Sequence, residues 1–251
     1  MNGDVTRPGA SAPPLTNAVL DFCPSRHGLH FPNRFEPGVV QRLIEPGITS
    51  MGLCGGMSFT VRDLFERGIL PPADREPPAR GTRRYGFLFR RQVESFDWLR
   101  LPLRFWLLAV LHRDPPAWWF RLLRRRPHGA LSRAQEWPRI RAEIDAGRLA
   151  QIGLVRELSA NPFRLTRNHQ VLGYAYRVEP ERVAIRIYDP NWPDADEVEL
   201  RLDLPTAGPP LLAQTTGEPL HAFFLARFVP AEPRAFEAGP AVHRGPGGRS
   251  E

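Results

Sequence analysis

The chain has 251 residues, a formal net charge of +7 and 42% hydrophobic residues, enough to bury the core of one large domain or two small ones. Its 28 prolines exclude a coiled coil or a bundle of long helices, and its two cysteines exclude a disulfide scaffold. No apolar run approaches the ~18 residues of a membrane-spanning helix. The start of the chain lacks the apolar stretch of a signal peptide, so we expect a cytoplasmic protein.

Positive charge is concentrated in one segment, and every basic residue apart from histidine is arginine. Residues 75–133 hold 14 arginines and four acidic residues, whereas the rest of the chain holds 20 arginines and 23 acidic residues. These arginines are dispersed along the segment and accompany no recognisable nucleic-acid-binding module. We therefore expect no nucleic-acid partner.

In chain order, a disordered tail over residues 1–17 is expected to precede the first helix. That helix follows Cys54, because apolar residues recur there with helical spacing: Met57, Val61, Leu64 and Phe65. Gly68 is expected to end it. A polar loop over residues 73–84 leads to helices in pieces over residues 85–126. The last predicted helix ends near Gly147 and contains Trp137, Ile140 and Ile144.

The second half of the chain changes to the pattern of strands. Apolar and β-branched residues gather at 149–155, 169–178, 183–188 and 222–229, and alternate with charged residues at 198–204. A turn over residues 179–181 and a second disordered tail over residues 230–251 are expected. Helices followed by an antiparallel sheet predict a single α+β domain over residues 18–229, with residues 75–133 as a basic helical insertion.

Cys54 is the sharpest candidate for a catalytic residue. It stands in Gly52-Leu53-Cys54-Gly55-Gly56-Met57, directly before the predicted helix. The N–H groups and partial positive charge of a helix N-terminus stabilise a thiolate, and the same N–H groups can bind an oxyanion. The flanking glycines are expected to leave room for a substrate backbone. The alternative is a small buried cysteine beside a glycine turn.

His169 and Asp189 are the candidate partners of Cys54, because a cysteine nucleophile needs a base and the base needs an orienting group. His169 opens one predicted strand, Asp189 ends the next, and Asn191 follows as an alternative orienting residue. A three-residue turn over residues 179–181 sets His169 opposite Asn191, with Asp189 on the same face. A four-residue turn puts Asp189 on the other face. The triad therefore requires a turn of odd length or a β-bulge; the alternatives are a core histidine and a turn-forming Asp-Pro.

The order Cys, His, Asp, with helix first and sheet second, resembles papain-like cysteine peptidases, in particular the branch of bacteriocin-leader peptidase-like domains. The similar motifs lie within residues 48–190: Leu-Cys-Gly-Gly at 53–56, Gly-Arg-Leu-Ala at 147–150, Asn-His-Gln-Val-Leu-Gly-Tyr at 168–174 and Tyr-Asp-Pro at 188–190. The resemblance implies a papain-like fold with Cys54 as nucleophile, His169 as general base and Asp189 as the residue that orients His169. It implies a cysteine peptidase or related thiol acyl hydrolase that acts on a peptide or acyl-bearing substrate without a cofactor.

The chain departs from that family at the oxyanion hole. The family has a glutamine about six residues before the cysteine, and here that position is Ile48. The remaining oxyanion candidates are the N–H of Cys54 and the side chains of Gln41 and Asn33. Since losing one donor typically costs ~10²–10³ in rate, an inactive member of the family is an alternative, as is a thiol acyltransferase.

Two further patterns have simpler interpretations. Cys23, His27 and His30 have a spacing that zinc could use, but a structural site needs four ligands, so we expect no metal.

Tryptophan beside arginine fits the boundary of a lipid bilayer, and this pattern occurs at Trp118, Trp119, Arg124, Arg125 and Arg126. The alternative function is therefore a non-catalytic papain-like binding protein that docks to a membrane surface or an acidic partner. Core packing of the tryptophans is the simpler interpretation.

Overall fold

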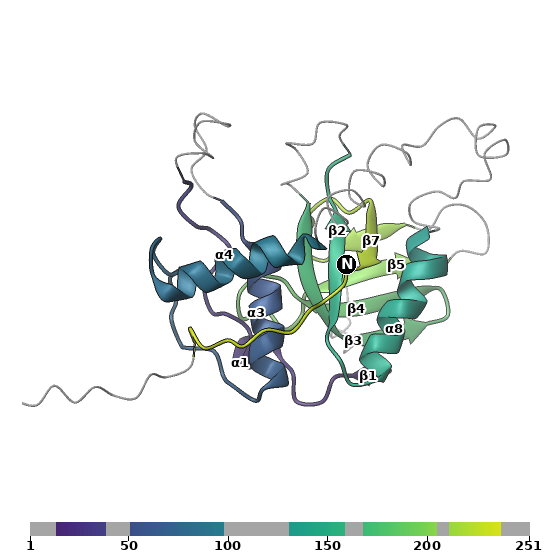
Figure 1. Cartoon of the computed structure of the whole chain (residues 1–251). Coiled ribbons are helices and arrows are strands. Elements are labelled where there is room, and N and C mark those ends of the chain that lie inside the picture. The colour runs from purple at the N-terminus through teal and green to yellow at the C-terminus, as the bar shows by residue number, and fades with distance from the viewer. Residues whose placement is uncertain (1–13, 39–50, 98–130, 159–167, 205–210, 237–251) are drawn as a thin grey trace, which may run out of the picture.

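The computed structural model describes residues 14–38, 51–97, 131–158, 168–204 and 211–236, which form an α+β domain with an antiparallel sheet (Figure 1). The helical elements are α1 (Pro24–His27), α3 (Cys54–Glu66), α4 (Arg83–Ser95), the π-helix η2 (Ser132–Glu136) and α8 (Trp137–Asp145). The strands are β1 (Asn17–Ala18), β2 (Ala150–Val155), β3 (His169–Glu179), β4 (Arg182–Tyr188), β5 (Glu199–Asp203), β6 (Leu212–Gln214) and β7 (Ala222–Leu225). The α+β class expected from the sequence is confirmed.

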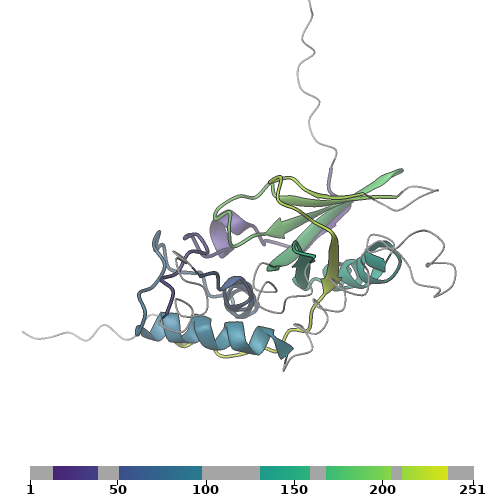
Figure 2. The same ribbon diagram turned by 90° about the horizontal axis from the view of Figure 1, so that it is seen from above.

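Seven strands form one sheet in the order β6-β5-β4-β3-β2-β7, and β1 pairs with β3 beside this path. In both views α3 and α4 lie to one side of β2 and β7, and α8 lies to the other side (Figures 1 and 2). Seen from above, α3 is sandwiched between α4 and the sheet (Figure 2). The start of α3 therefore has packed neighbours in both a helix and a strand.

Helix α3 begins at Cys54 and ends as the sequence predicts. Met57, Val61 and Leu64 are fully buried, as their helical spacing requires. Gly68 adopts a left-handed backbone conformation with φ of +66°, which glycine accepts without the cost of a Cβ contact. The Ile69 N–H then donates to the Leu64 carbonyl at 2.9 Å and closes the end of the helix.

The hairpin of β3 and β4 has a shorter turn than the sequence predicts. Glu179 pairs with Arg182, so the turn has the two residues Pro180 and Glu181 instead of the expected three. The pairing then shifts by one residue at Tyr174, where a β-bulge lies between Gly173 and Ala175. With a two-residue turn alone, His169 and Asp189 would lie on opposite faces of the hairpin. The bulge returns them to the same face, because a one-residue shift in pairing moves every later side chain to the opposite face.

The folded domain extends farther toward both ends of the chain than the sequence predicts. At the start, the N–H of Thr16 donates to the Tyr176 carbonyl at 2.8 Å and Asn17 belongs to β1, so the tail prediction to residue 17 is wrong there. At the other end, the N–H of Ala231 donates to Asp63 Oδ1 at 2.8 Å and Phe236 is only 5% exposed. The described part of the domain therefore reaches at least from residue 16 to residue 236, and its two ends pack against the sheet and against α3.

Of the basic segment, the structure describes residues 75–97 and 131–133, and helix α4 lies within the first of these ranges. It begins at Arg83, within the loop expected over residues 73–84, and Thr82 caps it by accepting from the N–H of Tyr85 at 3.2 Å. The predicted helices over residues 98–126 lie outside the described residues. Within the described ranges, every helix is too short or too polar to cross a membrane.

Candidate active site

The three residues of the predicted triad come together from three different elements. Cys54 is the first residue of α3, His169 is the first residue of β3, and Asp189 directly follows β4. His169 Nε2 lies 2.6 Å from Asp189 Oδ1, and the imidazole acts on the thiol of Cys54 through its charge and through hydrogen bonding, which shift the pKa values of both groups. Since Nε2 faces the carboxylate, Nδ1 is the ring nitrogen left for Cys54. His169 and Asp189 are buried, whereas Cys54 is partly exposed.

The surroundings of Cys54 favour the thiolate. Burial alone raises the pKa of the thiol, but the positive charge of His169, its hydrogen bond and the backbone N–H groups of Gln170 and Gly55 together hold the pKa of Cys54 below its ordinary value. The N–H groups at the start of α3 add the partial positive charge of the helix dipole, which also stabilises a thiolate. A thiolate is the nucleophilic form of cysteine, so Cys54 is set up to attack an electrophile that reaches its exposed side.

The histidine and the carboxylate stabilise each other's charge. Burial lowers the pKa of His169, but the charges of Asp189 and Cys54 and the hydrogen bonds to both outweigh burial and raise it to about 9. Burial raises the pKa of Asp189, yet the charge and hydrogen bond of His169, the charge of Arg156 and the N–H of Asn191 lower it to about 2. At neutral pH the site therefore holds an imidazolium and a carboxylate, and the lowered pKa of Cys54 favours its thiolate beside them.

The start of α3 is fixed by close backbone packing. The N–H of Gly56 donates to Gln92 Oε1 of α4 at 2.9 Å. A Cβ at Gly55 would lie 2.2 Å from Ser95 Oγ, and one at Gly56 would lie 2.2 Å from the Leu88 carbonyl oxygen. Both glycines are buried. The expectation that they leave room for a substrate is therefore wrong: they let α3 approach α4, and only Gly52 of the flanking glycines is exposed.

The three oxyanion candidates have different positions. At the first residue of an α-helix, the N–H of Cys54 has no acceptor within the helix, so it is free to point at a substrate oxygen. The amide of Asn33 has structural partners, because its Oδ1 accepts from the N–H of Leu53 at 2.6 Å and its Nδ2 donates to Asn191 Oδ1 at 3.1 Å. Gln41, like Ile48, lies outside the described residues.

Asn191 does not take the place of Asp189 beside His169. Its backbone N–H donates to Asp189 Oδ1 at 2.9 Å, and its side chain contacts Asn33 and Glu218 instead. Asn191 therefore supports the carboxylate, and Asp189 is the residue in contact with the imidazole.

Three residues beside Asp189 were missed in the sequence. Gln214 Nε2 donates to Asp189 Oδ2 at 2.7 Å, and Arg156 Nη2 donates to the same oxygen at 3.2 Å. Glu218 binds both terminal nitrogens of Arg156, at 2.9 and 3.0 Å. No local pattern marks them, because an arginine after a strand and a glutamate in a turn are common in any sequence. Only the pairing of distant strands brings them together.

The zinc-like pattern is divided between two separate contacts. His27 Nδ1 accepts from the N–H of Cys23 at 3.2 Å, and His30 Nδ1 contacts Asp194 Oδ1 at 2.5 Å. Within the part of the chain that the structure describes, no three His, Cys, Asp or Glu side chains are grouped as a metal site would need.

Trp118, Trp119 and Arg124 to Arg126 lie outside the described residues, so the predicted membrane contact stays a prediction.

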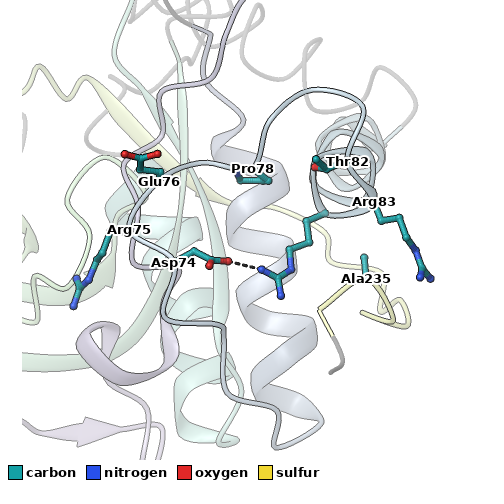
Figure 3. A pocket seen from close by; sticks show the side chains of 8 residues that line it. Asp74, Arg75, Glu76, Pro78, Thr82, Arg83 and Ala235 are labelled. Atoms are coloured by element: carbon teal, nitrogen blue, oxygen red, sulfur yellow. Dashed lines mark hydrogen bonds and ion pairs between the residues drawn. The ribbon is translucent and has the colours of Figure 1, made fainter. Parts of the chain in front are cut away.

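A pocket of about 600 Å³ lies away from the triad residues, between the loop before α4 and Ala235 (Figure 3). Asp74 and Arg84 form an ion pair across it, and Arg75, which also lines it, is paired with Asp194. None of the three triad residues lines this pocket, so we assign it no part in their chemistry.

Comparisons of the chain with protein-family models, with curated proteins and with solved structures found no match. The geometry of the site therefore carries the functional argument.

Proposed function

We propose that this protein is a papain-like cysteine hydrolase that cleaves an amide or thioester through an acyl-enzyme, with Cys54 as nucleophile, His169 as acid and base, and Asp189 as the residue that orients His169. The observation that carries the proposal is the convergence of these three side chains from α3, β3 and the end of β4. Such a set of nucleophile, base and orienting group is what covalent catalysis by cysteine requires.

The papain-like character is supported by two features. The nucleophile stands at the start of a helix that packs against an antiparallel sheet, and the histidine and carboxylate lie on neighbouring strands of that sheet. The order Cys54, His169, Asp189 along the chain is the order of that superfamily. A cysteine of purely structural function does not account for the imidazole and the two backbone N–H groups that lower the pKa of this thiol.

The chemistry follows from the charges of the site. The thiolate of Cys54 forms a bond to the carbonyl carbon, and the oxygen becomes an oxyanion beside the N–H of Cys54. The bond to the leaving nitrogen or sulfur then breaks as the imidazolium of His169 gives that atom a proton. His169, now neutral, takes a proton from water, the hydroxide attacks the acyl-enzyme, and the thiolate and imidazolium are restored. Asp189 keeps the ring in place throughout.

A burst experiment tests this proposal without knowledge of the natural substrate. The chain is mixed with p-nitrophenyl acetate, and release of p-nitrophenolate is followed while the acetylated residue is located by mass spectrometry. We expect a burst of about one equivalent per chain, as acyl-enzyme formation predicts, with acetate on Cys54. The variant Cys23→Ala should keep the burst, whereas Cys54→Ala and His169→Ala should lose it.

The same experiment separates hydrolysis from acyl transfer. If the acetyl group leaves Cys54 faster when an amine or thiol is added, and the acetylated amine or thiol accumulates, the protein is a transferase. Equal slow acetylation of both cysteines, with no effect of His169→Ala, would overturn the proposal and leave Cys54 as a packing residue.

A further inference from the structure

Asp189 lies between two positive groups. Its Oδ1 contacts His169 Nε2 at 2.6 Å, and its Oδ2 accepts from Arg156 Nη2 at 3.2 Å. An arginine so close to the carboxylate opposes the imidazolium, because it repels that cation and competes for the same negative charge. The side chain of Arg156 is only 10% exposed, so water weakens this effect little.

Glu218 is the second carboxylate that binds Arg156. Its two oxygens accept from Arg156 Nη1 and Nη2 at 2.9 and 3.0 Å, both shorter than the single contact between Arg156 and Asp189. Such a two-point contact fixes the plane of the guanidinium and balances its charge. The charges then alternate from the nucleophile to the surface: Cys54 negative, His169 positive, Asp189 negative, Arg156 positive and Glu218 negative.

Glu218 is itself held by several donors. It accepts from Thr216 Oγ1 at 2.9 Å and from Trp192 Nε1 at 3.3 Å. The amides of Asn191 and Gln214 also reach it, at 3.4 and 3.3 Å. Its side chain is 28% exposed, so the chain of charges ends at the surface of the protein.

We propose that Arg156 and Glu218 are positioning residues for the active site: the ion pair aims Asp189 at His169, and Glu218 balances the charge of Arg156 so that the carboxylate remains available to the imidazole. The inference rests on the proposed function and extends it to residues that lie beyond the triad. Neither residue touches the reacting sulfur, so each acts through Asp189. The other ionisable groups that act on Asp189 and His169 are Cys54 of α3 and the phenol of Tyr188.

Opposite charge changes provide the test. In a Cys23→Ala background, the alkylation rate of Cys54 by iodoacetamide is measured from pH 4 to pH 10, where the acidic inflection reports Cys54 and the basic one reports His169. Glu218→Gln removes a negative charge and is expected to lower the His169 inflection by about one unit, and that of Cys54 by less. Arg156→Gln removes a positive charge and is expected to raise both.

The double variant Arg156→Gln/Glu218→Gln is expected to return both inflections toward their original values, because the lost charges cancel. Arg182→Gln serves as the matched control, since its ion pair with Asp203 lies at the far end of β4 and should leave the profile unchanged. A role in folding alone would lower stability in every variant and would not move the two single variants in opposite directions.

Glu218→Gln is decisive by itself, because this partly exposed side chain keeps most of its shape as an amide and the variant leaves Arg156 paired with Asp189. An unchanged profile, or the same direction of shift as in Arg156→Gln, overturns the inference. If the original Cys54 shows no acidic inflection and reacts no faster than Cys23 in the unmodified chain, the proposed function itself fails. A normal profile that Glu218→Gln does not move rejects only the role of the Arg156–Glu218 pair.

Discussion

His169 and Asp189 share one face of the β3–β4 hairpin because the ladder between the two strands skips Tyr174. The turn has two residues, and without the shift in pairing between Gly173 and Ala175 the histidine and the carboxylate would point to opposite faces. With it, they meet at 2.6 Å. A bulge that redirects a side chain beside a reactive site is a recurrent use of this irregularity.

Asp189→Asn should separate the shape of the carboxylate from its charge. The amide fills the same space, but it no longer stabilises the imidazolium, so the pKa of His169 should fall from about 9 and the pKa of Cys54 should rise. At pH 5.5 the alkylation of Cys54 should slow by about tenfold or more, since one pKa unit corresponds to a factor of ten. Asp203→Asn is the control, because it breaks only the distant ion pair with Arg182. Equal rates in the original chain and Asp189→Asn would contradict the assignment.

His169→Ala should remove the cation that favours the Cys54 thiolate. Burial then dominates, and the thiol pKa should rise to at least the ordinary value of about 8.5. At pH 6 the alkylation rate of Cys54 should fall by at least about tenfold, while that of Cys23 stays the same. Peptide mass spectrometry after timed labelling measures both sites in one sample. A profile of Cys54 that is independent of residue 169 would mean that the imidazole does not control the sulfur.

Gly56→Ala should destabilise the protein through a backbone clash. The new Cβ would lie 2.2 Å from the Leu88 carbonyl oxygen and 3.0 Å from the Gln92 backbone nitrogen, so α3 and α4 must move apart. We expect a loss of about 1–3 kcal/mol in the free energy of unfolding, measured by urea denaturation.

Gly86→Ala is the matched control for that substitution. Nothing lies within 4 Å of a Cβ at Gly86 in α4, so alanine should stabilise the helix by about 0.5–1 kcal/mol. The same sign of effect at Gly56 and Gly86 would show that the approach of α3 to α4 is not what requires glycine at position 56.

Arg91→Met should destabilise the protein most strongly above pH 6. Arg91 Nε lies 2.8 Å from Asp63 Oδ2, and both side chains are buried. Removing one partner of such a pair costs about 3–5 kcal/mol, measured by urea unfolding at pH 8. The exposed Arg90 of the same helix provides the control, Arg90→Met, for which little change is expected.

The pH dependence of stability gives a further check on Asp63. Burial raises its pKa to about 6, against the lowering effect of the Ala231 N–H and of Arg91. A carboxyl whose folded pKa exceeds its unfolded value binds its proton more tightly in the folded state, so its contribution to stability falls as the pH rises from about 4 to 6. Asp63→Asn should remove this fall, and the cost of Arg91→Met should shrink at pH 5. A cost of Arg91→Met that is equal at pH 5 and pH 8 would contradict the raised pKa.

The sequence by itself determined the local elements and the candidates for the triad. The apolar spacing after Cys54 predicted α3, and Gly68 ended it, because side-chain periodicity and the left-handed preference of glycine act over a few residues. The same local rules placed His169 at the start of a strand and Asp189 at the end of the next. They also required an odd turn or a bulge, without deciding which of the two occurs.

Only the tertiary structure decided how these elements meet. The bulge at Tyr174 has no signal in composition, because it depends on the strands packed around β3. Gly55 and Gly56 serve the approach of α3 to α4, which neither helix specifies alone. Arg156 and Glu218 are 62 residues apart in the chain, and they contact each other beside Asp189 because the strands that precede them, β2 and β6, belong to one folded sheet.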